Sequence, residues 1–198
     1  MRVVAAACAA VVCLSLTHEA LAADPADSTV AIGADLQAII PVGDLSDATS
    51  FMIGPLVRGG YRVIPQLELT GRLGYIHGFG AESAPNFSSS LGVIPIWAGA
   101  RYFFQEGERP AGAYAGGELG INILRSSVSY DGPTVPGAPT ISGSDTEARV
   151  GLNLSGGYII SRELPIDLRG QLSFLNLFDG DTTLIGIGVS AGYSFFVL

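Results

Sequence analysis

The chain has 198 residues, of which 48% are hydrophobic and only 14% are charged. This length fits one domain, and the charge content is sparse for a soluble domain, where about 25% is usual. The net charge is −8, and all ten basic residues are arginine. Binding to nucleic-acid phosphates needs a basic face, so the acidic balance argues against a nucleic-acid partner.

Residues 1–22 have the pattern of a secretory signal peptide. Arg2 supplies the positive start, an apolar run follows over residues 3–16, and residues 20–22 read Ala-Leu-Ala, the small-x-small pattern of a cleavage site. A helix that spans a membrane needs roughly 20 apolar residues, which disfavours an N-terminal anchor. We therefore expect export, with cleavage after Ala22.

The mature chain is expected to contain no disulfide. Both cysteines, Cys8 and Cys13, lie within the expected signal peptide, so neither remains after cleavage. Residues 23–27 are then a short N-terminal segment, and residues 28–198 form a single domain.

The mature sequence is typical of β-strands throughout. Apolar residues alternate with small or polar ones, and clusters of Gly, Pro, Asp and Ser interrupt the runs. The expected strands are residues 28–39, 51–62, 66–78, 91–105, 111–125, 147–161, 165–175 and 182–197. Short connections alternate with longer ones, at 40–50, 79–90, 126–146 and 176–181. This pattern predicts an all-β fold, an eight-stranded antiparallel up-and-down transmembrane β-barrel with both termini at its short-turn end.

The alternation leaves open which face of each strand lies inside. A soluble barrel, such as a periplasmic binding barrel, would turn its apolar row inward. Here the opposite row is mostly glycine and serine with isolated charges, which suits a crowded lumen better than a solvated surface. The apolar row also carries aromatics near strand ends, as in the girdles of membrane barrels. We therefore expect the apolar row to face lipid. The aromatic residues are Phe51, Tyr61, Tyr75, Phe79, Tyr102, Phe104, Tyr158, Phe174, Phe178, Tyr193 and Phe195.

The closing run, residues 192–198 with the sequence GYSFFVL, resembles the last strand of small bacterial outer-membrane β-barrels, of the OmpA-like transmembrane-domain and OmpW-like kind. The segment PVGDL at residues 41–45 is also similar to members of that group. The resemblance implies an outer-membrane location, extracellular loops, periplasmic termini and contact with lipopolysaccharide. It also implies that Tyr193 and Phe195 form the C-terminal signal read by the outer-membrane assembly machinery. One departure is the last residue, Leu198, where these proteins usually end on phenylalanine.

The inward row collects five arginines and five acids, which is formally neutral. They are Asp35, Arg58, Glu68, Arg72, Arg101, Glu118, Glu147, Arg149, Asp167 and Arg169. Eight strands enclose a space that side chains fill, and a charge buried there must be paired. We expect a charged plug; a narrow path for ions or small solutes is the alternative.

Candidate chemistry is sparse. His77 is the only histidine after the expected signal, and near Glu82 and Ser83 it could belong to a lipid A-modifying enzyme. Its parity places it on the lipid-facing row, which favours an ordinary interfacial residue. One histidine without cysteine provides no zinc site, and the glycine pairs have no following lysine, so we expect no metal or cofactor. Acidic residues in the loops are interpreted as solvated loop tips.

The sequence therefore predicts a non-enzymatic integral outer-membrane protein, expected to be a monomer, with a structural or surface-interaction role. The alternative is a passive channel or transporter for small or hydrophobic solutes. A lipid A-modifying enzyme is the weakest of the membrane alternatives. The scaffold itself does not choose among these functions.

Overall fold

The computed structural model describes residues 30–80, 87–105, 111–130, 142–161, 163, 165–178 and 184–196. The expected signal peptide at residues 1–22 and the segment 23–27 lie outside these ranges, as does Leu198. Cleavage therefore stays a prediction.

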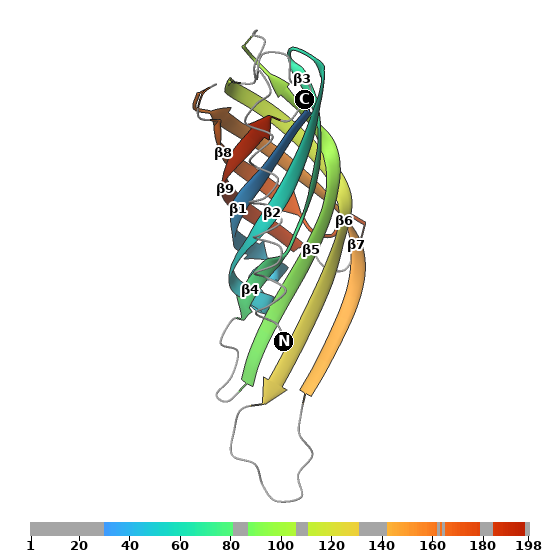
Figure 1. Ribbon diagram of the computed structural model, residues 1–198. Coiled ribbons are helices and arrows are strands. Elements are labelled where there is room, and N and C mark those ends of the chain that lie inside the picture. Colours follow the sequence, from blue (N-terminus) through green and yellow to red (C-terminus); the bar gives the residue numbers. More distant parts are fainter. Residues whose placement is uncertain are drawn as a thin grey trace, which may run out of the picture.

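The described chain forms one antiparallel sheet that curls into a barrel (Figure 1). In chain order its elements are β1 (Val30–Gly43), α3 (Asp44–Ala48), β2 (Thr49–Ile64), β3 (Leu67–Gly74), β4 (Ile76–Gly80), β5 (Phe87–Phe103), β6 (Gly112–Tyr130), β7 (Ser142–Ile159), β8 (Ile166–Phe174) and β9 (Leu184–Phe196). No helix within the described ranges is long and apolar enough to cross a membrane.

Closure of the sheet makes a ring of eight strands, as the sequence predicts. The first and last strands pair with each other: Ala31 lies opposite Phe196, and Gly43 lies opposite Leu184. The other edge of β1 pairs with β2, so each strand of the ring has a neighbouring strand on both sides. Because β1 begins where β9 ends, both ends of the barrel chain lie at the short-turn end.

One predicted strand, residues 66–78, is divided into β3 and β4, which share one wall position. The division falls at Tyr75, whose N–H donates to the carbonyl of Pro55 over 3.1 Å. Proline has no N–H with which to complete the pair, so the ladder is interrupted there.

Strands β5, β6 and β7 continue farther than predicted at the long-loop end (Figure 1). The expected loop 126–146 contains the end of β6 and the start of β7, and residues 126–129 pair with residues 142–145. The prediction relied on apolar alternation, which fades here because both faces are largely polar. The backbone pairing between the strands continues although the alternation fades. We call this three-stranded part the extension.

The outer wall of the barrel is apolar, as predicted from the alternation. Leu36, Ile40 and Val189 are more than half exposed, at 55%, 62% and 64%. Aromatic side chains lie near both ends of this wall. Tyr61, Tyr102, Phe104 and Tyr158 are exposed at the short-turn end, and Phe51, Tyr75, Phe79 and Phe178 at the long-loop end.

Candidate functional site

A layer of charged side chains fills the part of the barrel interior nearer the short-turn end. Alternation on each strand turns every second side chain inward. Eight of the ten predicted lumen residues meet there, all at most 4% exposed: Asp35, Arg58, Glu68, Arg72, Arg101, Glu118, Asp167 and Arg169.

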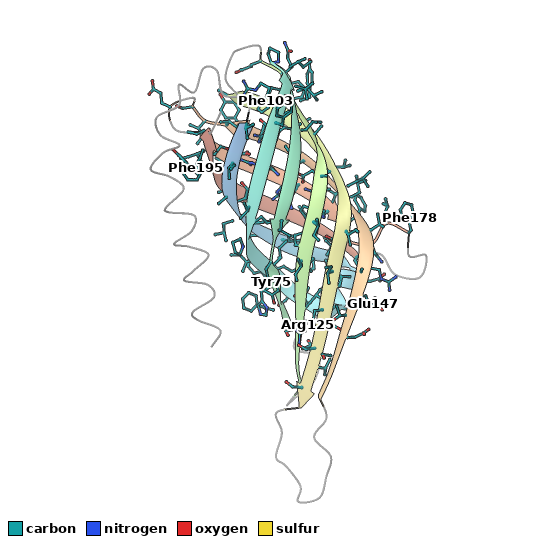
Figure 2. The ribbon with its side chains drawn as sticks, turned by 45° about the vertical axis from the view of Figure 1, so that its right-hand side comes forward. Tyr75, Phe103, Arg125, Glu147, Phe178 and Phe195 are labelled. Carbon is teal, nitrogen blue, oxygen red and sulfur yellow. The ribbon has the colours of Figure 1, made fainter. Side chains whose placement is uncertain are left out.

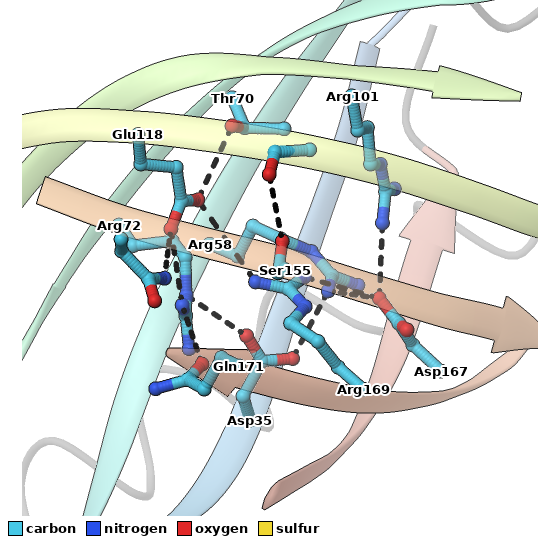
Figure 3. Close-up of polar contacts among 12 residues, drawn as sticks. Asp35, Arg58, Thr70, Arg72, Arg101, Glu118, Ser155, Asp167, Arg169 and Gln171 are labelled. Atoms are coloured by element: carbon cyan, nitrogen blue, oxygen red, sulfur yellow. Dashed lines mark hydrogen bonds and ion pairs between the residues drawn. The ribbon is translucent and has the colours of Figure 1, made fainter. Parts of the chain in front are cut away.

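Six of these residues form a closed ring of ion pairs across the lumen (Figure 3). Asp35 lies between Arg58, at 3.1 Å, and Arg72, at 3.4 Å. Arg72 contacts Glu118 at 3.2 Å, and Glu118 lies 3.9 Å from Arg169. Asp167 completes the ring by pairing with Arg169 at 3.2 Å and with Arg58.

Asp167 is the most connected acid of the ring. Besides its two ring partners it accepts a hydrogen bond from Arg101 at 2.9 Å, and Arg101 pairs in turn with Glu68 at 2.8 Å. The hydroxyl of Tyr114 donates to the other carboxylate oxygen at 2.6 Å. Three arginines therefore depend on this carboxylate.

Neutral side chains complete the network, and the sequence analysis did not single them out. Gln37 accepts a hydrogen bond from Arg72 at 2.7 Å, and Asn153 donates to Glu118 at 2.8 Å. The side chain of Trp97 lies near Arg72, whose guanidinium carbon is 5.3 Å from the centre of the ring. These residues could have been found from the sequence, because each lies at an inward position of a predicted strand.

The charged layer is balanced, because four arginines face four acids. Burial of an unpaired ion costs several kcal/mol, and that cost is recovered only where partners and hydrogen bonds satisfy both ions. Each of the eight ions contacts at least one opposite charge, but among the described residues the facing atoms Oδ2 of Asp35 and Nε of Arg72, 3.4 Å apart, form no hydrogen bond.

Apolar layers cover the charged layer on both sides, which the sequence analysis did not predict. Toward the long-loop end lies a buried cluster of Ile39, Leu45, Met52, Leu56, Ile76, Leu91, Val93, Trp97, Leu124 and Leu175. Leu45 comes from the short helix α3, in the expected loop 40–50, and it is fully buried. Toward the short-turn end, Phe103, Tyr114 and Ile159 form a second cluster. Along the barrel axis, the interior therefore consists of an apolar layer, the charged layer and a second apolar layer.

Glu147 and Arg149 do not belong to this layer, which corrects the predicted lumen network. They pair with each other at 2.6 Å, with their side chains 49% and 33% exposed. Their parity is inward, but pairing between β7 and β8 starts only at Leu152. The two residues therefore lie beyond the paired part of β7 and β8. Glu147 is labelled in Figure 2.

His77 lies on the outer wall, as its parity predicts. Its ring makes an edge contact with Phe79, at 4.9 Å between centroids, and stacks on Tyr75 at 6.5 Å. Glu82 and Ser83, the partners considered for lipid A chemistry, lie outside the described residues. Within the part of the chain that is described, no group of three or more His, Cys, Asp or Glu side chains could hold a metal ion.

Tyr193 and Phe195 lie two residues apart near the end of β9. Their rings make an edge contact with 4.7 Å between centroids. Their recognition by the assembly machinery remains a prediction.

Closed strand topology, an apolar outer wall and a filled interior define a fold, that of the small eight-stranded outer-membrane β-barrels. Comparison with known structures supports this fold. The attachment invasion locus protein Ail of Yersinia pestis is 15% identical, with a TM-score of 0.56; the match covers 85% of this chain and 97% of that one. Neisserial surface protein A is 18% identical over 85% of this chain and 97% of that one, with a TM-score of 0.52. The N-terminal β-barrel domain of Pseudomonas aeruginosa OprF is 12% identical over 83% and 97%, also with a TM-score of 0.52. No family model and no curated protein matches the sequence.

Proposed function

We propose that this protein is an integral outer-membrane β-barrel with a structural or surface-interaction role, and that its long-loop end faces outward. The observation that carries the proposal is the layered interior. Side chains of Asp35, Arg58, Arg72 and Asp167 meet across the lumen, and apolar clusters lie above and below them. With the interior occupied, the loops and the extension are the surfaces left for an interaction.

The outer-membrane location is supported by the wall and by the comparisons. Exposed Leu, Ile and Val side chains around the barrel match a hydrocarbon environment, and the structures with the same fold are outer-membrane proteins. Ail is described as an attachment invasion locus protein, and NspA as a surface protein. These roles agree with a function exercised at one exposed end.

Conductance in planar bilayers tests the closed interior. We expect the purified, refolded protein to insert without stable single-channel steps. Large and stable steps would contradict the proposal and favour the passive-channel alternative.

Orientation is tested separately by labelling intact cells. Single cysteines are placed at Ser46 in α3 and at Glu163 in the short β7–β8 connection, with a membrane-impermeant maleimide as the label. We expect label at position 46 and none at 163 until the cells are lysed. The reverse pattern would refute the proposed orientation.

A further inference from the structure

A row of outward-facing residues marks the border between the apolar wall and the extension. The register places His77 opposite Gly92, and Gly92 opposite Arg125. Thr146 continues the row on β7. The next row toward the short-turn end is apolar and consists of Ile94, Ile123 and Ala148. The next row toward the loops is hydroxylated and consists of Ser90, Ser127 and Ser144.

Gly92 is buried in this row, because a neighbouring side chain lies over it. A Cβ atom added at Gly92 would lie 2.9 Å from the hydroxyl oxygen of Tyr75, so the phenol ring extends across the glycine. Arg125 lies one strand farther on, at a spacing of about 4.8 Å. Tyr75 therefore extends across β5 toward the strand that carries Arg125. The two residues lie on the same side of the barrel in Figure 2.

Arg125 differs from the arginines of the lumen. It is exposed, and it forms no ion pair with any residue that the structure describes. The acids nearest along β7, Asp145 and Glu147, alternate with Thr146 and therefore occupy the opposite face of the extension. The outward face around Arg125 thus offers a cation and hydroxyl groups, with no acid among its described residues.

The position of Arg125 identifies the kind of ligand that it would meet. Lipid acyl chains contact the apolar rows below, so lipid headgroups lie level with Arg125 when the barrel is in a bilayer. A guanidinium binds phosphate oxygens through paired, charge-assisted hydrogen bonds.

The serines above Arg125 favour a headgroup with hydroxyl groups of its own. The hydroxyls of Ser90 and Ser127 lie 2.7 Å apart and form a polar surface directly beyond the arginine. Ser127, Ser129 and Ser144 also help to line a hollow of about 350 Å³ at the end of the extension. Hydroxyl groups can donate to and accept from the hydroxyls of a sugar.

We infer that Arg125, Tyr75 and Ser127, arranged around Gly92, bind the phosphate and adjoining sugar of a phosphorylated glycolipid that stands beside the barrel. This inference rests on the proposed function, because it requires the long-loop end to lie in the leaflet that contains such a lipid. The phosphate contacts the guanidinium of Arg125 on the side that faces the Tyr75 hydroxyl. The sugar lies against the serine row.

The test measures lipid retained by the full-length protein in phosphatidylcholine nanodiscs that contain a small fraction of diphosphorylated lipid A. Protein is released into detergent, and bound lipid A is counted by native mass spectrometry. We expect Arg125→Ser to lower retention by about tenfold, the effect of losing a charged hydrogen-bonding partner. Gly92→Val displaces the Tyr75 hydroxyl from its place over the glycine without changing charge, and it is expected to lower retention as well. Arg149→Ser is the matched control, because it removes a charge at the same end from the opposite face.

Retention by Arg125→Ser equal to that of Arg149→Ser would overturn the inference. Equal retention of phosphatidylglycerol and lipid A by the unaltered protein would overturn the sugar contact. Each variant is first shown to be a folded barrel, by a gel shift that appears only after boiling. If the unaltered protein failed to insert into bilayers, the proposed function itself would be refuted. Insertion without selective lipid A retention refutes only the binding site.

Discussion

Replacement of Asp167 by asparagine tests whether the charged layer depends on balanced pairing. The substitution keeps the size of the side chain and removes one negative charge from the lumen. Arg58, Arg101 and Arg169 all contact this carboxylate in the folded barrel. In the variant four buried arginines face three acids, and one positive charge is left without compensation.

The expected loss is large, because the orphaned charge cannot reach water. Removal of one partner from a buried ion pair costs about 3–5 kcal/mol, whereas exposed pairs contribute about 0–1 kcal/mol. Asp167 is 2% exposed, and its arginine partners are at most 4% exposed. We therefore expect Asp167→Asn to lower the free energy of unfolding by about 3–5 kcal/mol. Glu147→Gln, which alters the exposed pair with Arg149, is expected to lower it by at most about 1 kcal/mol.

Equilibrium unfolding by urea in lipid vesicles measures both variants. Trp97 is the only tryptophan in the chain, and its indole donates to Asn122 inside the lumen at 3.0 Å. Its fluorescence therefore reports directly on the interior. The denaturant slope must stay constant across the variants for the free energies to be compared.

A second substitution separates charge balance from a general loss of packing. Arg58→Gln in the Asp167→Asn background restores three cations and three anions, and Asp35 keeps its contact with Arg72. We expect the double variant to be more stable than the sum of the two single losses predicts. Strictly additive losses, or equal losses for Asp167→Asn and Glu147→Gln, would refute the reasoning.

Three further predictions concern the layers around the charges and the wall. Leu45→Ala opens a cavity beneath α3 and should lower the free energy of unfolding by about 2–5 kcal/mol in the same urea assay, whereas a loss below 1 kcal/mol would show that the helix does not seal the interior. Tyr114→Phe removes the hydroxyl that donates to Asp167 and should lower the free energy of unfolding by about 1–3 kcal/mol, whereas unchanged stability would contradict a contribution from this hydrogen bond. Gly99→Val should abolish the gel shift of the folded barrel, because a Cβ there would overlap the backbone carbonyl oxygen of Gly117 on β6. Gly71→Val should preserve the shift, since the nearest atom is 3.9 Å away. Equal behaviour of the two glycine variants would contradict the assignment of inward and outward faces.

Most of the wall could be predicted from the sequence, because period-two alternation is a local property. The opposite exposures of Leu36 and Asp35 follow directly from it. The eight members of the charged layer were found by the same parity. The pairing between these residues could not be predicted, because Arg58 and Asp167 are 109 residues apart and meet only through the register of several strands.

The missed features have different causes. The break at Tyr75 depends on Pro55, which lies opposite it on another strand. Leu45 was missed because it lies within a segment interpreted as a loop. Met52, Ile76 and Val93 have inward parity on predicted strands, but parity alone does not show that they gather in one apolar layer. Glu147 and Arg149 have inward parity, but parity does not reveal where a barrel stops being closed.

The ring of ion pairs also constrains the order of assembly. Asp167 lies on β8, whereas Arg58 and Arg101 lie on β2 and β5, so the chain carries both arginines long before the carboxylate that they share. An open sheet of the earlier strands would bring a half-paired cluster of guanidinium groups toward hydrocarbon, at a cost of several kcal/mol for each ion. Water must remain with these groups until β8 arrives. Deep insertion of the wall and closure of the ring are therefore expected to occur as one concerted event.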